Sequence, residues 1–155
     1  MPRRQAGPDD EVKLDPVLDF LRELWALDHA FDRISKRMLA RIGITAEQRV
    51  LIRIVGETPG ISAGDLADLL HVDAGTTSAA LRRLEERKLL VRERDPNDGR
   101  RVTVDLTPSG KRLNVPRSGT VESAVERTLA DSSPSEVRAL RRVFARLIEA
   151  LDAEV

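Results

Sequence analysis

Apolar residues recur along the chain with two periods, one typical of helices and the other of strands. Between Ser62 and Lys88, leucines and alanines return every three or four positions in two short blocks, which predicts two short helices. Ser62 and Asp73 precede these blocks, and each can cap a helix by accepting a hydrogen bond from a free backbone N–H. In the second helix the expected core positions are Thr77, Ala80, Leu81 and Leu84. The stretch therefore predicts a helix-turn-helix.

Two β-like runs follow the second helix directly. Residues 90–94 form the first run, and residues 101–106 form the second, in which valine and leucine alternate with polar residues. Residues 95–100 between them consist mostly of Asp, Asn, Pro and Gly, which favour turns. The sequence thus predicts a β-hairpin, or wing, directly after the helix-turn-helix.

Further helices are expected before this stretch. A long helix is predicted to begin at Asp15-Pro16 and to end near Ile42-Gly43, and its apolar residues fall on two flanks. We expect such a helix to pack on its own chain and on a second copy. The Thr45-x-x-Gln48 pattern is a capping box that opens the next helix, and Ile61 is a candidate third strand.

After the wing, a helix is predicted from Pro108, with a kink or break between Leu113 and Thr120 caused by Pro116 and Gly119. A last amphipathic helix follows Ser133. The expected fold is mainly α with a small β wing, in which a winged helix-turn-helix is joined to a helical dimerisation region built from both termini. The expected organisation is a disordered tail (1–14), a dimerisation helix (15–44), the winged helix-turn-helix (45–107) and C-terminal dimerisation helices (108–155).

The outward face of the second helix has the composition needed to enter a DNA groove. Small residues lead and arginines follow, at Ala74, Gly75, Thr76, Ser78, Ala79, Arg82 and Arg83. A slim leading turn fits a major groove about 12 Å wide, and arginines behind it reach base edges or phosphates. The wing adds Arg94, Asp98, Arg100 and Arg101, and arginine is attracted to the negative potential of a minor groove. An ordinary amphipathic surface helix has the same spacing, but the adjacent wing favours DNA binding.

At these residues the sequence resembles the MarR family of bacterial transcription regulators. The resemblance rests on Leu-Ala-x-x-Leu at 66–70, on TTSAALRRLEERKLL at 76–90, on Asp98-x-Arg100, and on Leu-Thr-x-x-Gly at 106–110. It implies a homodimer that binds a pseudo-palindromic operator, with the second helix in the major groove and the wing arginine in the minor groove. It also implies base contacts from Gly75, Thr76, Ser78 and Ala79, phosphate contacts from Arg82 and Arg83, and a wing pair of Asp98 and Arg100.

The sequence departs from the family pattern at two positions. Many members have arginine where this chain has Ala79, and Lys88 replaces the glycine usual at the end of the second helix. A left-handed backbone conformation at that helix end is most easily adopted by glycine or asparagine. The sequence therefore does not by itself determine the path of the chain from the second helix into the wing.

Charge and composition limit the partners that the chain can have. The 155 residues include 26 basic and 26 acidic residues, so that the formal net charge is zero and a generic polyanion binder is disfavoured. Residues 82–112 nevertheless contain ten basic and six acidic residues, a local excess of four. The absence of cysteine excludes disulfides and thiol-based peroxide sensing, and no apolar run approaches the roughly 20 residues of a membrane span. We therefore expect a cytoplasmic protein.

A small-ligand site is a further hypothesis. Trp25 and His29 lie one helical turn apart with Asp28 nearby and could form the wall of a site for a small anionic or aromatic ligand. Arg49 and Arg53 of the next helix could counter the charge of an anionic ligand. The alternative, which the sequence favours, is that Trp25 fills a dimer core and His29 makes one hydrogen bond. One histidine with scattered acids is a weak metal signal, so no metal site and no cofactor are predicted.

The leading functional hypothesis is a ligand-responsive transcription regulator, most often a repressor in families of this kind. A winged-helix adaptor that binds proteins without specific DNA binding is the alternative, which the zero net charge and Ala79 slightly favour. No enzyme is predicted, because no nucleophile and base stand at a recognisable spacing and no glycine-rich phosphate loop is present.

Overall fold

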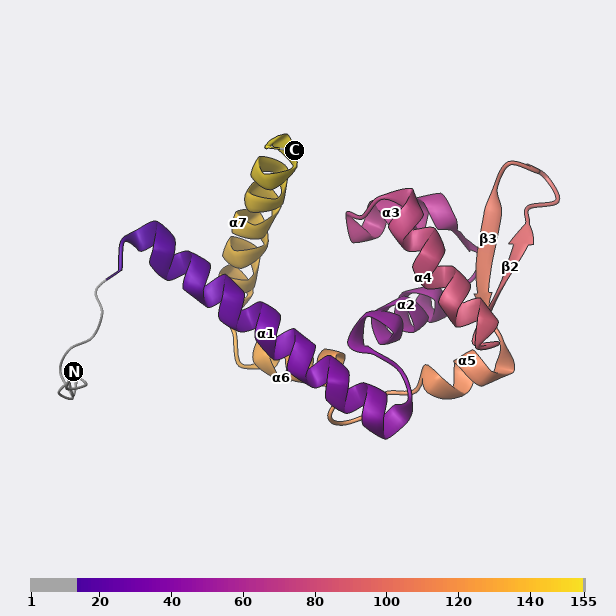
Figure 1. Ribbon diagram of the computed structural model, residues 1–155, viewed down its shortest axis with the longest axis horizontal. Coiled ribbons are helices and arrows are strands. Elements are labelled where there is room, and N and C mark those ends of the chain that lie inside the picture. The colour runs from indigo at the N-terminus through magenta and orange to yellow at the C-terminus, as the bar shows by residue number, and fades with distance from the viewer. Residues whose placement is uncertain (1–13, 155) are drawn as a thin grey trace, which may run out of the picture. The chain divides into compact units, whose positions relative to one another are not determined.

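The computed structural model describes residues 14–154, so that residues 1–13 of the predicted tail lie outside the described residues. Figure 1 shows the elements in chain order: α1 Pro16–Ile42, α2 Ala46–Glu57, β1 Ile61–Ser62, α3 Ala63–Leu70, α4 Ala74–Glu86, β2 Leu90–Arg94, β3 Val102–Leu106, α5 Pro108–Leu113, α6 Val121–Ala130 and α7 Pro134–Ala153. They form two compact units, one ending at Arg33 and the other beginning at Ile34. The predicted fold, mainly α with a small β wing, is confirmed.

The predicted helix caps are all present. Ser62 and Asp73 accept hydrogen bonds from the backbone N–H groups of Asp65 and Thr76 at the starts of α3 and α4. Thr45 forms a complete capping box with Gln48 at the start of α2, and Ser133 forms one at the start of α7. Because each cap satisfies backbone donors that have no partner inside the helix, these residues define where the helices begin.

The three strands form one antiparallel sheet in the order β1-β3-β2. Leu90 pairs with Leu106 at one end of the hairpin and Arg94 with Val102 at the other, and Figure 1 shows the hairpin as a long two-stranded arm. Ile61 pairs with Val104, which confirms the predicted third strand. Val104 and Leu106 of β3 are buried in the core that the sheet shares with α2, α3 and α4.

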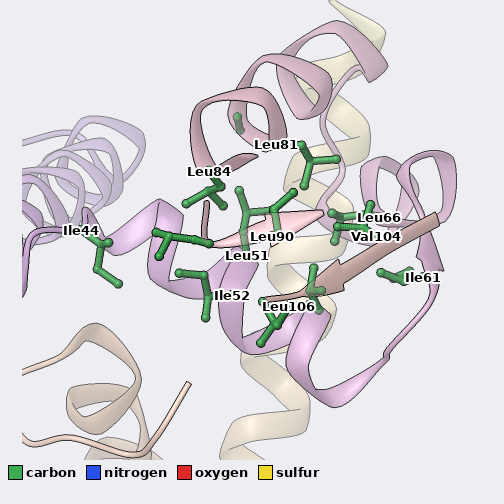
Figure 2. Packing of buried hydrophobic residues seen from close by; sticks show 13 residues of the cluster. Ile44, Leu51, Ile52, Ile61, Leu66, Leu81, Leu84, Leu90, Val104 and Leu106 are labelled. Atoms are coloured by element: carbon green, nitrogen blue, oxygen red, sulfur yellow. The ribbon is translucent and has the colours of Figure 1, made fainter. Parts of the chain in front are cut away.

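The main core joins the helix-turn-helix to this sheet. Figure 2 shows Leu51 and Ile52 of α2, Leu81 and Leu84 of α4, and strand residues converging on one cluster. The four core positions predicted in α4 are all buried. A buried leucine or isoleucine contributes roughly 1.5–3 kcal/mol relative to an exposed one, so this cluster holds α4 against its support.

The apolar spacing predicts a buried face formed by Leu66, Leu69 and Leu70 in α3 and one formed by Val50, Leu51, Ile54 and Val55 in α2, and both predictions are partly wrong. In α3, Leu69 is 57% exposed while Ala67 is 4% exposed, so the buried stripe passes through Leu66 and Ala67. In α2, Ile52 is completely buried, whereas Val50 and Ile54 are only half-buried. Both helices are covered on more than one side by the sheet and neighbouring helices, and periodicity alone does not reveal where each neighbour lies.

The predicted break after the wing is confirmed. The chain leaves α5 at Leu113 and starts α6 at Val121, and Gly119 between them has φ +72°. Arg49 of α2 holds this break: its side chain is 0% exposed and donates to Glu122 Oε1 at 2.6 Å, to the carbonyl of Leu113, and to the carbonyl of Val115 at 2.7 Å. Arg49 thus satisfies carbonyls that the end of α5 leaves free.

Large apolar side chains remain exposed on α1 and on α7. In the unit that ends at Arg33, Leu18 is 54% and Trp25 68% exposed. In the other unit, α7 buries none of its residues, and Leu140 and Leu151 are 51% and 59% exposed. Amphipathic helices with uncovered apolar faces are typical of surfaces that bind a partner.

Candidate nucleic-acid interface

The exposed face of α4 carries all the α4 residues predicted to contact DNA. Because Thr77, Ala80, Leu81 and Leu84 pack into the core, the helix turns its other side to solvent. An open hollow on that side is lined by Gly75, Ser78, Ala79, Arg82, Arg83 and Glu86. The side chain of Arg82 is paired with Glu86 at 2.9 Å, and both are largely exposed, so that the pair is weak and exchangeable.

The first turn of α4 is capped by the carboxylate of Asp73. Asp73 accepts hydrogen bonds from the Thr76 hydroxyl at 2.5 Å and from the Thr76 backbone N–H at 2.8 Å. These bonds lower the pKa of Asp73 below its ordinary value, so that the cap is ionised at neutral pH. Ala74 and Gly75 follow with almost no side-chain bulk, which leaves this end of the helix slim.

The tip of the wing is shaped by side chains that bind its own backbone. Asp95 accepts from the N–H of Asn97 at 2.8 Å, and Asp98 accepts from the N–H of Arg100 at 3.0 Å. Asp98 therefore sets the turn from which Arg100 projects. Arg94 and Arg100 are both exposed. Within the described chain no hydrogen bond or ion pair is recorded for either side chain, and both are available to an external anion.

Two ion pairs brace the wing against the helices. Arg92 of β2 binds Glu85 of α4 at 2.6 Å, and Arg101 binds Asp65 of α3 at 2.7 Å. Arg101, which the sequence grouped with the groove-reading arginines, is thus already engaged within the chain. Sequence reasoning did not find either brace, because no spacing rule links an arginine of the wing to an acid on a separate helix.

The connection from α4 into the wing contains a residue in the left-handed conformation, at the position where Lys88 replaces the usual glycine. Lys88 has φ +56°, and its carbonyl accepts a hydrogen bond from the Thr107 hydroxyl at 2.7 Å. Arg87 donates to the carbonyl of Gly43 at 2.5 Å and to Gln48 at 3.1 Å. The end of α4 is therefore tied both to the start of α5 and to the turn before α2.

The Leu-Thr-x-x-Gly pattern has a packing cause. Gly110 is buried, and a methyl group built at its Cα would overlap the carbonyl oxygen of Leu89. The Thr107 backbone N–H donates to that same oxygen at 3.2 Å. Only glycine allows α5 to approach the start of β2 this closely.

The five residues of the predicted ligand site divide between the two units. In the first, the Trp25 and His29 rings lie 6.1 Å apart, edge to face, and Asp28 approaches His29 at 3.8 Å. In the second, Arg49 is buried and bound to Glu122, so that the expectation of Arg49 as a counter-charge for a ligand is not supported. Arg53 binds the Asn114 carbonyl at 2.6 Å and Glu57 at 3.1 Å.

The Arg49–Glu122 pair also sets the charge state of the carboxylate. Partial burial favours a raised pKa for Glu122, but the hydrogen bond from Arg49 and further hydrogen bonds outweigh it and lower the pKa below its ordinary value. Among residues 14–154, no three His, Asp or Glu side chains gather in a way that could hold a metal ion. None of the helices in that range is long and apolar enough to cross a membrane.

Comparison with known proteins identifies the fold and its lineage. A family model described as "MarR family" matches residues 42–101, from the turn before α2 to the end of the wing tip. The chain belongs to the MarR family. The MarR-family region thus contains α4 and most of the wing, the same elements that carry the exposed arginines.

Two curated relatives extend the similarity beyond this region. The chain is 35% identical over 109 residues to the HTH-type transcriptional regulator TtmR of Methylorubrum extorquens, covering 70% of this chain and 55% of TtmR, so that it spans just over half of that relative. It is 27% identical over 147 residues to the organic hydroperoxide resistance transcriptional regulator of Bacillus subtilis, covering 92% of this chain and 94% of the relative.

A solved structure shares the fold. The Staphylococcus aureus MepR–DNA complex superposes with a TM-score of 0.70 and 23% identity, over 85% of this chain and 97% of MepR. At this identity the likeness concerns the winged-helix fold of the MarR family, and the site itself is argued from this chain's own residues.

Proposed function

We propose that the protein is a sequence-specific DNA-binding transcription regulator that acts as a homodimer on a pseudo-palindromic operator. The observation that carries the proposal is the joint exposure of the slim α4 face and of Arg100 on a wing braced to α3 and α4. The MarR-family relatives are named transcriptional regulators, and MepR was solved bound to DNA.

In this proposal α4 enters the major groove and the wing reaches the minor groove. Gly75, Thr76, Ser78 and Ala79 present small groups to base edges, while Arg82 and Arg83 reach phosphates. Because the Ala79 side chain has no polar atom, polar base contacts from this face depend on the hydroxyls of Ser78 and of Thr76, the second of which also donates to Asp73. Arg94 and Arg100 extend the contact along the backbone and into the minor groove.

The exposed apolar faces support the homodimer. Isolated large hydrophobic residues are ordinary on a protein surface, but α1 and α7 each carry several that are exposed. Burying such faces against a second copy across a two-fold axis presents two copies of α4, which matches half-sites one helical turn of DNA, about 34 Å, apart.

The proposed mode of regulation is repression that a ligand relieves. The proposed place of action is the cytoplasm, where the operator is accessible. A ligand alters operator affinity only as far as it prefers one arrangement of the two readers. The hydroperoxide response of the Bacillus subtilis relative is not carried over, because the chain has no cysteine thiol to oxidise.

The test is a salt titration of DNA binding by three arginine variants. With a fragment from the region upstream of its own gene, the wild-type affinity is expected to fall steeply as salt rises. Arg82→Ala and Arg100→Ala are each expected to weaken binding and to reduce the salt slope by about 1, as expected for one lost phosphate contact. Arg138→Ala, which removes an exposed charge from α7, is the matched control and should leave the slope unchanged.

Two results would contradict the proposal. Binding that is absent, or that does not respond to salt, would favour a winged-helix adaptor that recognises proteins. An equal loss of affinity for Arg138→Ala and Arg100→Ala would show that the effect reflects total charge and not the α4 and wing surface.

A further inference from the structure

The tip of the wing contains a pair of residues that can react with each other. Asp98 and Gly99 form the single place in the 155 residues where an aspartate or an asparagine is followed by glycine. Both residues are exposed, in the turn that joins β2 to β3 at the far end of the hairpin (Figure 1). Exposed loop tips tolerate conformational change more readily than helices or strands do. The pair is therefore open to a reaction between a side chain and the backbone.

The hydrogen bonds of the tip keep the Asp98 carboxyl close to the next peptide. Its Oδ1 accepts from the backbone N–H of Arg100, two residues ahead, at 3.0 Å. A side chain bound in this way folds along the main chain across the intervening peptide, so its carboxyl carbon is held beside the Gly99 nitrogen. Within residues 14–154 no hydrogen bond is recorded for the Gly99 N–H, and a methyl group at its Cα would meet no atom within 4 Å beyond the chain neighbours.

Asp95 provides a comparison within the same turn. Its Oδ1 accepts from the backbone N–H of Asn97 at 2.8 Å, so that this carboxyl also bonds two residues ahead. The intervening residue is Pro96, whose nitrogen has no hydrogen to lose. Attack of the next backbone nitrogen on the side-chain carboxyl is therefore open at Asp98 and blocked at Asp95, although both carboxyls are placed alike.

We propose that Asp98 is a site of spontaneous isomerisation from aspartate to isoaspartate. The Gly99 nitrogen attacks the side-chain carboxyl carbon of Asp98, a ring closes to a succinimide, and the amide hydrogen and the carboxyl hydroxyl leave as water. A second water then adds to the backbone carbonyl carbon of Asp98 and breaks its bond to the Gly99 nitrogen. The chain now runs through the former side-chain carbonyl, and the former backbone carbonyl becomes a free carboxylate. One water is released and one is taken up, with no oxidation or reduction.

The consequence for DNA binding rests on the proposed function. Isoaspartate places one additional carbon atom in the main chain and removes the Asp98 carbonyl that accepts from the N–H of Arg101 at 2.8 Å. The side-chain carboxyl that holds the N–H of Arg100 becomes part of the main chain. The number of carboxylates is unchanged, so a loss of DNA affinity would reflect the displacement of Arg100 and not the net charge.

The reaction is measured first without DNA, on the full-length chain. The protein is aged at neutral pH in water enriched in the heavy oxygen isotope and is then digested with trypsin in ordinary water. The peptide from Asp95 to Arg100 is expected to gain heavy oxygen, which fragmentation places at Asp98. It should also give a second chromatographic peak, which isoaspartyl methyltransferase methylates. Asp95 in the same peptide is the internal control and should gain no heavy oxygen.

Gly99→Ala tests the part that glycine has in the reaction. The added methyl group hinders the approach of the nitrogen to the carboxyl carbon while meeting no other part of the chain, so the variant should gain heavy oxygen several-fold more slowly. Gly64→Ala, on α3, is the matched control and should react at the wild-type rate. No heavy oxygen at Asp98, equal amounts at Asp95 and Asp98, or equal rates for Gly99→Ala and the wild type would each overturn the proposal.

The DNA measurement separates this inference from the proposed function. The fraction of aged wild-type protein that binds the upstream fragment is expected to fall as isoaspartate accumulates, and aged Gly99→Ala should lose less. Isoaspartate in a protein whose fresh form does not bind DNA would sink the regulator and leave the modification site standing. DNA binding by fresh protein that forms no isoaspartate would sink the site and leave the regulator standing. Isoaspartate without any loss of DNA binding would contradict the displacement of Arg100.

Discussion

Arg49 offers the sharpest test of how the winged helix is held to the C-terminal helices. The residue is 0% exposed and donates to Glu122, Leu113 and Val115. The variant Arg49→Met keeps the apolar length of the side chain and removes every donor. It leaves a carboxylate and two backbone carbonyls without their partner at the α5–α6 break.

The magnitude follows from the burial of the two partners. Removing one member of a buried ion pair costs about 3–5 kcal/mol. The Glu122 side chain is 30% exposed, so water regains part of the loss, and the lower end of this range, about 3 kcal/mol, is expected. Since each kcal/mol shifts the melting temperature of a chain of this size by about 2–4 °C, the variant should melt roughly 10 °C below the wild type.

The assay is denaturant and thermal unfolding at one fixed protein concentration, because a dimer's apparent stability depends on concentration. The matched control is Arg53→Met on the same helix, whose side chain is 28% exposed and whose loss should cost about 1 kcal/mol or less. If the two variants lost equal stability, the buried position of Arg49 would have no special role and the reasoning would be refuted.

Three further predictions concern stability. Lys88→Gly should stabilise the protein by about 0.5–1 kcal/mol relative to Lys88→Ala, because the residue has φ +56°, and denaturant unfolding of both variants measures the difference. Gly110→Ala should destabilise by about 3 kcal/mol or more through overlap with the Leu89 carbonyl, while Gly99→Ala, which meets no atom within 4 Å, should be near neutral in the same assay. The lowered pKa of Glu122 predicts stability that is fully present above pH 4.5 and is lost as pH falls through the folded-state pKa, so a series of unfolding curves from pH 6 to pH 3 should show a shallower acid decline for Glu122→Gln; parallel curves would contradict this assignment.

The braces of the wing have a consequence for DNA recognition. Arg92–Glu85 and Arg101–Asp65 join the hairpin to α4 and α3, so that the wing is tied at two points to the helices that carry the α4 face. Exposed pairs of this kind add little stability individually. Their effect is on geometry, because a wing tip that kept changing its distance from α4 would contact successive phosphates poorly.

Local features of the chain were determined by the sequence alone. Thr45, Ser62, Asp73 and Ser133 each begin a helix where expected, and the break after Leu113 and the turn-rich wing tip also follow from nearby residues. Caps, turns and proline effects act over three or four residues, so the relevant atoms are all within reach of one short segment.

Tertiary structure decided the features that join distant segments. Arg49 was expected to face a ligand, but its carboxylate partner lies 73 positions away, and burial of a charge depends on such a partner being brought to it. In the same way Ile52 is buried because the sheet covers a second side of α2, and Arg101 binds Asp65 because β3 lies beside α3. Periodicity records that a face is apolar, whereas the neighbour that covers it is chosen only when the whole chain folds.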